Sequence, residues 1–159
     1  MEAGVAAKAR EKTRDILDLN AFLPYRLSIL SNTVSEAISR IYAERFGLSI
    51  PGWRVVAILA QHPGLSAGEA AVRTAMDKVA VSRAVAQLLE AGYLERQFAD
   101  EDRRRSMLTL SAKGWGVYDQ VVPLARRMEA ALVESLSPQD RAAFDRLLAR
   151  LTERALQLK

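Results

Sequence analysis

The sequence predicts a mainly helical fold that carries one small β-hairpin. Three observations support this prediction. Apolar residues recur at spacings of three and four in several long segments, as they do on one face of a helix. Serine, proline and glycine occur where those segments begin and end, at the positions that helix termini favour. Between two helical segments, two short strand-like stretches enclose a loop with three consecutive arginines, residues 103–105.

Two helices are predicted in the first part of the chain. The first begins near Pro24 and is expected to stop at Gly47, and its apolar face consists of Leu27, Leu30, Val34, Ile38 and Ile41. The second follows Ser49, with Pro51 in its first turn. Apolar residues occur on nearly every side of this second helix, so we expect it to be buried. Residues 1–15 alternate charge with alanine and are expected to be a frayed helix or a disordered arm.

Four further helices and the hairpin are predicted after residue 65. Ser66 and Glu69 have the spacing of a capping box, which predicts the start of a short third helix. A fourth helix is predicted over residues 77–91, closed by a glycine and followed by the hairpin. Ser111 is a suitable N-cap for the fifth helix, and Ser137, followed by proline, for the sixth.

A short helix followed by an arginine-tipped hairpin is the layout of a winged helix-turn-helix lobe. In such a lobe one helix fits the major groove of DNA, and the hairpin, or wing, reaches the backbone or the adjacent minor groove. On a helical wheel of residues 77–91, one side is apolar and the other is mostly small with a few hydrogen-bond donors. The second side consists of Val79, Ser82, Arg83, Ala86 and Gln87, with Lys78 at its edge. A solvated helix face is the alternative interpretation.

Each polar residue of this face has a possible partner in DNA. Arg83 has the donors to pair with guanine, and Gln87 has the amide to pair with adenine. Ser82 is suited to a base or a phosphate, and Val79 to a thymine methyl group. The wing adds Arg103, Arg104 and Arg105, which cannot all point the same way in an extended loop. We expect one of them to turn back to Asp100 or Asp102, although a solvated charge cluster is again the alternative.

The apolar faces of the outer helices predict a second, helical lobe. We assign residues 1–15 to a possibly disordered arm, 16–48 to a dimerisation helix, 49–112 to the DNA-binding lobe and 113–159 to C-terminal dimerisation helices. A second copy of the chain is the simplest cover for these faces, because two-fold pairs are the commonest oligomers. An intramolecular three-helix bundle is the alternative.

The composition excludes several classes of site. The absence of cysteine removes disulfides, thiolate metal sites and thiol chemistry, and a single histidine argues against zinc. No nucleophile–base pair or phosphate loop is present, so we expect neither an enzyme nor a cofactor. The net charge of +4 permits nucleic-acid binding. No apolar run approaches the roughly 20 residues of a membrane span, and no signal peptide is evident, so we expect a cytoplasmic protein without a membrane partner.

The chain resembles the MarR family of bacterial winged-helix regulators over roughly residues 20–157. The most specific match is the wing, residues 102–114, which is similar to the family pattern of Asp-x-Arg, a short apolar strand, Leu-Thr or Leu-Ser, and Gly. Residues 77–85 and 51–55 are also similar to family segments. The resemblance implies a dimer that reads a pseudo-palindromic operator in double-stranded DNA, with Asp102 and Arg104 as paired wing residues.

The resemblance also implies a repressor that releases DNA when a small, often aromatic, anionic ligand binds. Residues 24–32 and 76–83 look like those of regulators of aromatic-acid catabolism, including the hydroxycinnamate type. The ligand is then an aromatic carboxylate or its coenzyme A thioester, with Tyr25 and Trp53 as candidates to contact a ring and Arg26 to meet the anion. The alternatives are core packing for the aromatic residues and a surface charge for Arg26. For the whole protein, the alternatives are a protein-interaction module and a DNA binder without an effector.

Overall fold

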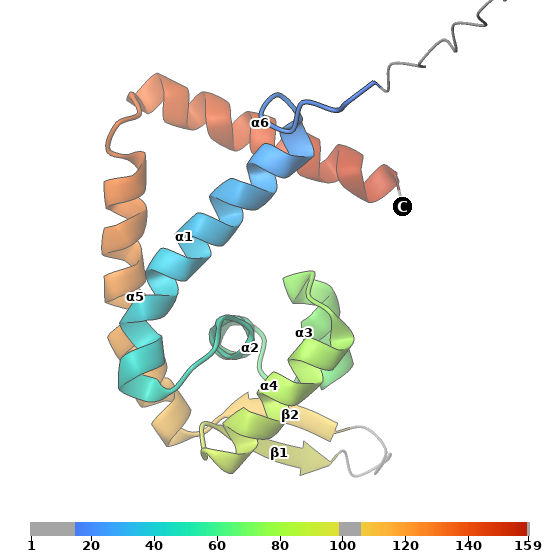
Figure 1. Ribbon diagram of the computed structural model, residues 1–159. Helices are drawn as coiled ribbons and strands as arrows, with labels where there is room; N and C mark the ends of the chain where they lie inside the picture. The colour runs from blue at the N-terminus through green and yellow to red at the C-terminus, as the bar shows by residue number, and fades with distance from the viewer. Residues whose placement is uncertain (1–14, 99–105, 159) are drawn as a thin grey trace, which may run out of the picture. The chain divides into compact units, whose positions relative to one another are not determined.

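The computed structural model describes residues 15–98 and 106–158 and contains six helices and one hairpin within them (Figure 1). The elements are α1 Leu23–Phe46, α2 Ile50–Gln61, α3 Ala67–Thr74, α4 Lys78–Glu90, β1 Leu94–Phe98, β2 Ser106–Leu110, α5 Ala112–Val133 and α6 Pro138–Gln157. The predicted fold class is confirmed. The chain divides into two compact units, residues 1–34 and residues 35–159, and α1 begins in the first unit and ends in the second.

Side-chain caps start five of the six described helices, and three of them, at Ser66, Ser111 and Ser137, are N-caps that the sequence predicts. The capping oxygens accept backbone N–H groups at 2.9–3.2 Å, and they belong to Ser49, Ser66, Asp77, Ser111 and Ser137. At α3 the complete capping box forms, because the Glu69 carboxylate also accepts the backbone N–H of Ser66 at 2.8 Å. The single histidine, His62, is exposed at the C-cap of α2. These local hydrogen bonds fix where each helix begins.

The turn between α3 and α4 requires a left-handed residue, and that residue is Ala75. Its φ of 51° and ψ of 34° allow its own N–H and that of Met76 to reach the final carbonyls of α3. A residue with a side chain in this left-handed region of φ and ψ costs roughly 1 kcal/mol relative to glycine. The turn therefore sets the angle between the two helices at some expense of stability.

We expect Ala75→Gly to raise the free energy of unfolding by about 1 kcal/mol, because glycine adopts this conformation without steric cost. Urea denaturation of the two proteins measures the difference. Ala86→Gly, on the exposed side of α4, is the matched control and should lower the free energy of unfolding by about 1 kcal/mol. A loss of stability in Ala75→Gly would show that the left-handed conformation is not the source of strain.

The hairpin is antiparallel, with Leu94 opposite Leu110 and Phe98 opposite Ser106. One additional bridge joins Leu65, in the segment before α3, to Leu108 of β2. Leu94, Leu108 and Leu110 are buried, whereas the rest of β1 is exposed. The hairpin is therefore anchored to the core by β2 and by the first residue of β1.

The core of the second unit lies among α2, α3, α4, the hairpin and the first half of α5. Its largest fully buried residues are Tyr42, Leu59, Leu108, Val55, Val56, Val81, Val85 and Val121. The apolar side predicted for α4 is confirmed, since Val81, Ala84, Val85 and Leu88 are all buried. This packing fixes which side of α4 faces away from the protein.

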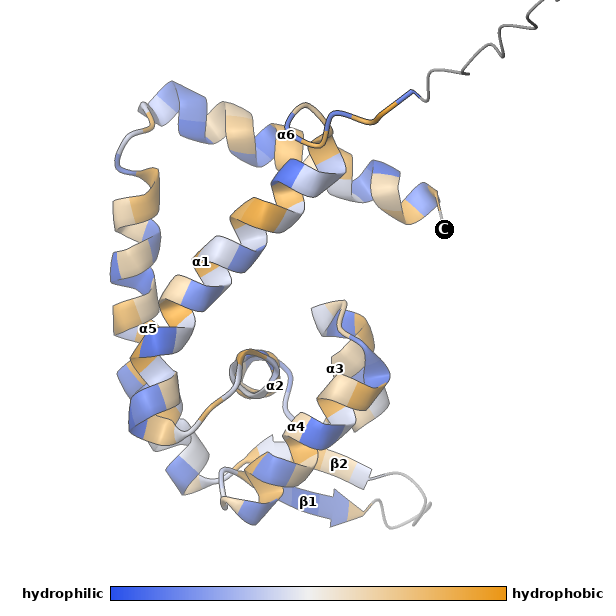
Figure 2. Cartoon of the chain, viewed as in Figure 1, coloured by the Kyte–Doolittle hydropathy of each residue, from blue (hydrophilic) through white to orange (hydrophobic). Residues whose placement is uncertain are grey.

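Apolar residues at the two ends of the chain are exposed. In the first unit every described residue from 15 to 30 is exposed, including Phe22, Tyr25 and Ile29. None of the described residues of α6 is buried, although Phe144, Leu147, Leu148 and Leu151 lie along it. Figure 2 shows this alternation of apolar and polar residues along both helices. The N-terminal part of the apolar face of α1 and the apolar residues of α6 are thus largely exposed, whereas Ile38 of α1 packs against the core.

Candidate nucleic-acid interface

The exposed face of α4 carries all five of its predicted DNA-contacting residues. Lys78, Val79, Ser82, Arg83 and Gln87 are each exposed, and Val79 retains 56% of its surface although it is apolar. They share this face because the valines and leucine that alternate with them at helical spacing are buried beneath. This exposed face therefore combines small or apolar side chains with three long hydrogen-bond donors, Lys78, Arg83 and Gln87, and the hydroxyl of Ser82.

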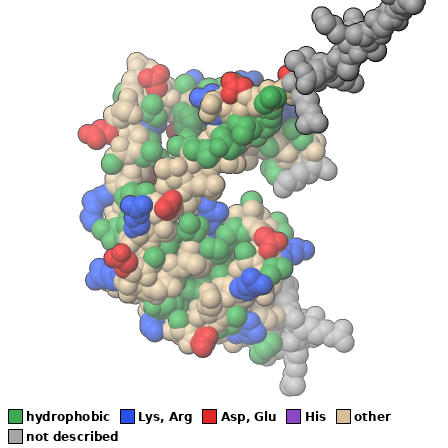
Figure 3. Space-filling view, viewed as in Figure 1, with side chains coloured by type: hydrophobic (Ala, Val, Ile, Leu, Met, Phe, Trp, Pro, Cys, Tyr) green, Lys and Arg blue, Asp and Glu red, His purple; other side chains and the backbone are tan. Residues whose placement is uncertain are grey.

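A surface hollow between α3 and α4 extends this face. It measures about 590 Å³ and is lined by Gly68, Glu69, Val72, Arg73 and Lys78. Val72 is 75% exposed, an unusual state for a valine in the middle of a helix. Figure 3 shows basic side chains over the α3–α4 region of the molecule. Because Arg73 and Lys78 line the same hollow, Arg73 adds a second arginine, besides Arg83, near the N-terminal end of α4.

Sequence reasoning missed Val72 and Arg73. A signal for them existed in the capping box, which fixes the rotation of α3. Once Ser66 is the N-cap, the inward residues are Ala70 and Ala71. The two residues that follow must then point outward, since adjacent helical residues are about 100° apart.

The two acidic residues beside this face are already engaged in helix capping. One Asp77 carboxylate oxygen accepts the backbone N–H groups of Val79 and Ala80 at 2.9 and 3.0 Å. The Glu69 carboxylate accepts both the backbone N–H and the hydroxyl of Ser66 at 2.8 Å. Each negative charge is therefore partly offset by the positive end of a helix. The uncompensated charges that remain on α3 and α4 here are positive.

The predicted wing contacts, Asp102, Arg103, Arg104 and Arg105, lie outside the described residues, as does Asp100. The strands that lead to them are described. At the far end of β1, Phe98 is 58% exposed. The described part of the hairpin thus runs from a buried base at Leu94 and Leu110 to an exposed end at Phe98.

The candidate ligand residues fall in two places. Tyr25 and Arg26 belong to the first unit and line one hollow of about 370 Å³, together with Asn20, Ile29, Leu30 and Thr33. Trp53 belongs to the second unit, where its ring stacks between those of Tyr42 and Tyr118 at centroid distances of 5.7 and 6.0 Å. Core packing therefore accounts for part of the Trp53 ring, as the alternative interpretation expected.

Trp53 also lines a second hollow, and Arg54 beside it was not singled out by sequence reasoning. This hollow measures about 210 Å³ and includes Gln61 and Thr74. The Arg54 guanidinium donates to the Ser35 hydroxyl at 3.2 Å. Burial raises the pKa of the nearby Tyr42 phenol, and the positive charge of Arg54 opposes that rise. The available sequence signal was a single arginine within a mostly apolar helix. In the structure this arginine is half-buried.

Two other classes of site are absent from the part of the chain that the structure describes. Within residues 15–98 and 106–158, no group of three or more histidine, cysteine, aspartate or glutamate side chains is placed to hold a metal ion. Across the same residues, no helix is both long enough and apolar enough to span a membrane.

Comparison with known proteins agrees with this arrangement. The sequence profile of the MarR family matches residues 46–105. The HTH-type transcriptional repressor Rv2887 of Mycobacterium tuberculosis is 28% identical over 131 residues, which cover 82% of this chain and 91% of that protein. A MarR/EmrR family regulator from Acinetobacter sp. ADP1 has a similar structure, with a TM-score of 0.80, 25% identity, and coverage of 89% of this chain and 99% of that one.

A third similar structure is that of Bordetella bronchiseptica BpsR, whose DNA binding is regulated by 6-hydroxynicotinic acid. Its TM-score is 0.76 at 19% identity, with coverage of 87% of this chain and 98% of that one. At this identity the likeness concerns the fold. All three comparisons extend well beyond the α2–β2 segment into the outer helices, since each covers more than four fifths of the chain.

Proposed function

The chain belongs to the MarR family of winged helix-turn-helix transcriptional regulators, and from that premise we propose that it is a homodimeric repressor of a pseudo-palindromic operator. In this proposal a small aromatic acid, or its coenzyme A thioester, releases the repressor from double-stranded DNA. The single observation that carries the DNA-binding part is the exposed face of α4. Apolar and small residues there, with Arg83 and Gln87 projecting, match the needs of a helix in the major groove.

The contacts divide into those that read bases and those that hold the backbone. We assign Arg83, Gln87 and Val79 to base edges and Ser82 to either a base or a phosphate. Lys78 is assigned to a phosphate, because it lies at the rim of the α3–α4 hollow. The wing arginines 103–105 are assigned to the backbone or the minor groove, with Asp102 holding one of them in place by an ion pair.

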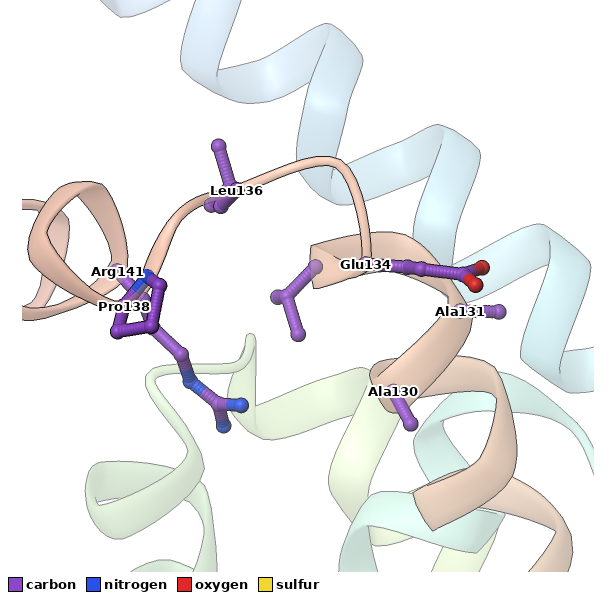
Figure 4. Close-up of a pocket in the computed structure, with 7 residues that line it drawn as sticks. Ala130, Ala131, Glu134, Leu136, Pro138 and Arg141 are labelled. Atoms are coloured by element: carbon purple, nitrogen blue, oxygen red, sulfur yellow. The ribbon is translucent and has the colours of Figure 1, made fainter.

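The exposed apolar residues at both ends of the chain support the homodimer. Figure 4 shows a further apolar feature, a hollow of about 610 Å³ where α5 meets α6. Ala130, Ala131 and Leu136 contribute to its lining, with Pro138 and Arg141 from the start of α6. Apolar side chains exposed on a protein surface often mark a contact with another protein. A second copy covers such faces on both partners at once, and it supplies the second reading helix that a two-fold operator needs.

The hollow in the first unit supports an aromatic anion as the effector. Tyr25 offers an aromatic ring, Arg26 a guanidinium for bidentate carboxylate binding, and Ile29 and Leu30 apolar walls. Its volume of about 370 Å³ lies within the range of small-molecule sites. The regulation of BpsR by 6-hydroxynicotinic acid is a precedent on the same fold. Trp53 belongs to the second unit and lines a separate hollow, where it stays a candidate to contact an aromatic ring.

Release requires that the effector prefer one arrangement of the dimer. Two reading helices fit successive major grooves only when their centres are about 34–36 Å apart. We propose that the bound effector favours a different separation. A ligand with equal affinity for both arrangements would not shift their populations, however tightly it bound.

Fluorescence anisotropy of the purified protein on its own upstream intergenic DNA tests the proposal. We would measure binding at two salt concentrations, with and without a panel of aromatic acids and their coenzyme A thioesters. Binding should weaken steeply with salt, because phosphate contacts release counterions. One compound of the panel should release the DNA. Salt-sensitive binding that no compound reverses would instead favour a DNA binder without an effector.

Arg26→Ala is expected to weaken binding of the active compound by about 1.5–3 kcal/mol, the worth of a charge-assisted hydrogen bond, with DNA affinity unchanged. Isothermal titration calorimetry measures the change. Arg40→Ala, on the exposed surface of α1, is the matched control, because among the described residues Arg40 forms an ion pair only with Glu36 one turn away. An Arg26→Ala protein with the wild-type affinity for the compound would remove Arg26 from the effector site.

A protein-interaction module is the second candidate, and one observation favours it. Val72 and Val79 are both more than half exposed on the α3–α4 surface, as in an apolar docking face. Salt separates the two candidates, since an apolar protein interface does not weaken steeply with ionic strength. The absence of specific DNA binding at either salt concentration would favour this second candidate.

A further inference from the structure

Three segments that are distant in the sequence meet at the C-terminal end of α4. They are the turn Ala91–Tyr93, the start of α5 at Ser111–Gly114, and the last residue of α1, Phe46. We call this meeting point the α4–α5 joint. The last carbonyls of a helix have no partner inside the helix and must bond elsewhere. At the joint, the carbonyls just past α4 are bonded by residues of α5.

Ser111 performs two functions with one hydroxyl. Its oxygen accepts the backbone N–H of Gly114 at 3.0 Å, which caps α5. Its hydrogen is donated to the carbonyl of Gly92 at 2.6 Å. The backbone N–H of Ser111 also donates to the carbonyl of Tyr93 at 3.1 Å. A residue that needed only to cap α5 would not require the second bond.

Lys113 is placed against the preference of its own helix. A positive charge in the first turn of α5 is unfavourable with the dipole of that helix, and α5 has no acidic residue there. The ammonium group instead donates to the carbonyl of Ala91 at 2.7 Å, at the negative end of α4. It also lies 4.7 Å from the centroid of the Tyr93 ring, in cation–π contact. Lys113 therefore stabilises the contact between two helices at some expense to α5.

Tyr93 extends the joint to a third helix. Its phenol donates to the carbonyl of Phe46, at the end of α1, at 3.1 Å. Its backbone N–H donates to the carbonyl of Leu88 inside α4 at 2.8 Å. One residue is thus bonded to α4 by its backbone and to α1 by its side chain. The joint leaves the end of α4 little freedom to rotate independently of α5.

We propose that Ser111, Lys113 and Tyr93 are positioning residues that fix the direction of α4 relative to α5 and thereby set the operator half-site spacing that the dimer accepts. The inference rests on the proposed function, because it assumes two reading helices held by paired helical lobes. A rigid joint transmits any movement of α5 to α4. A loosened joint lets each α4 find its half-site independently, so that discrimination between spacings is lost before binding itself.

The test compares operators that differ only in spacing. An operator is first selected from random duplexes by the wild-type protein, and its half-sites are then moved closer or farther by one and two base pairs. Each base pair turns the second half-site by about 34–36°, so a rigid dimer should discriminate sharply. Three variants loosen the joint. Ser111→Asp keeps the cap but cannot donate to Gly92, Lys113→Met removes the charge, and Tyr93→Phe removes only the phenol.

We expect the wild-type protein to prefer its best spacing by about tenfold or more, since a misplaced half-site loses base contacts worth about 1–3 kcal/mol each. In Ser111→Asp and Lys113→Met the preference should fall to about threefold or less, and Tyr93→Phe should lie between. Arg127→Met, an equal loss of charge on the exposed surface of α5, should keep the wild-type preference. The readout is a ratio within one protein, so a partly inactive preparation does not change it.

Unaltered ratios in both Ser111→Asp and Lys113→Met would overturn the inference while leaving the repressor proposal intact. Failure of the wild-type protein to select any duplex would contradict the proposed function and, with it, the inference.

Discussion

Gly114→Ala is expected to lower the free energy of unfolding by about 3 kcal/mol, a large share of the stability of a domain this size. A Cβ atom at this position would lie 2.1 Å from the carbonyl oxygen of Tyr93 and 3.1 Å from its carbonyl carbon. Both are backbone atoms held by the α4–α5 joint, so neither can rotate away. The start of α5 would have to separate from the turn, with loss of the Ser111 hydrogen bonds.

Gly116→Ala provides the control in the same helix. A Cβ atom at Gly116 meets no heavy atom within 4 Å. We expect this change to raise the free energy of unfolding by about 1 kcal/mol, because alanine is the better helix former. Urea denaturation followed by circular dichroism compares the two variants. If Gly114→Ala were as stable as Gly116→Ala, the close approach of α5 to the turn would not exist in solution.

Arg83→Ala is expected to reduce operator affinity by about 1–3 kcal/mol at each half-site, and hence by at least about 25-fold for a dimer that contacts both. Arg83 projects from the exposed face of α4, so the free energy of unfolding should change by no more than about 0.5 kcal/mol. The loss should be confined to one base-pair position per half-site, because a paired guanidinium recognises guanine. Binding to duplexes mutated at that position should differ little between the variant and the wild-type protein.

Arg73→Ala distinguishes a base contact from a backbone contact. Arg73 lies in the α3–α4 hollow, so we expect its loss to weaken all sequences alike and to reduce the slope of affinity against salt by about one. Anisotropy titrations over a salt series give both quantities. An Arg83→Ala protein that showed this uniform pattern would assign Arg83 to the phosphate backbone and leave Gln87 as the base-reading residue.

The helices and their starting points could be predicted because they depend on local chemistry. Ser66 and Glu69 bond to groups only three residues away, so their spacing in the sequence already contains the geometry. The same holds for the inward face of α4, which follows from the helical period alone. Five of the residues assigned to DNA contacts lie on the opposite face for that reason.

The contacts that could not be predicted join residues far apart in the chain. Tyr93 and Phe46 are 47 residues apart, and Lys113 and Ala91 are 22 apart, and no periodicity relates them. Gly114 looked like one element of a family pattern, yet its reason is the carbonyl of Tyr93. Trp53 illustrates an ambiguity of residue type, since one ring both packs in the core and lines a surface hollow.

In the proposed homodimer, the exposed length of α6 links the lifetime of a chain to the concentration of other copies. None of the described residues of this helix is buried, and an isolated helix of 20 residues is marginal in water. If a second copy covers α6, a newly made chain is expected to have a frayed tail that proteases can cut until it pairs. Dilute chains would then be removed faster than concentrated ones. Such a protein would accumulate only above a threshold rate of synthesis. Its abundance would then rise by more than the proportional increase in gene dosage.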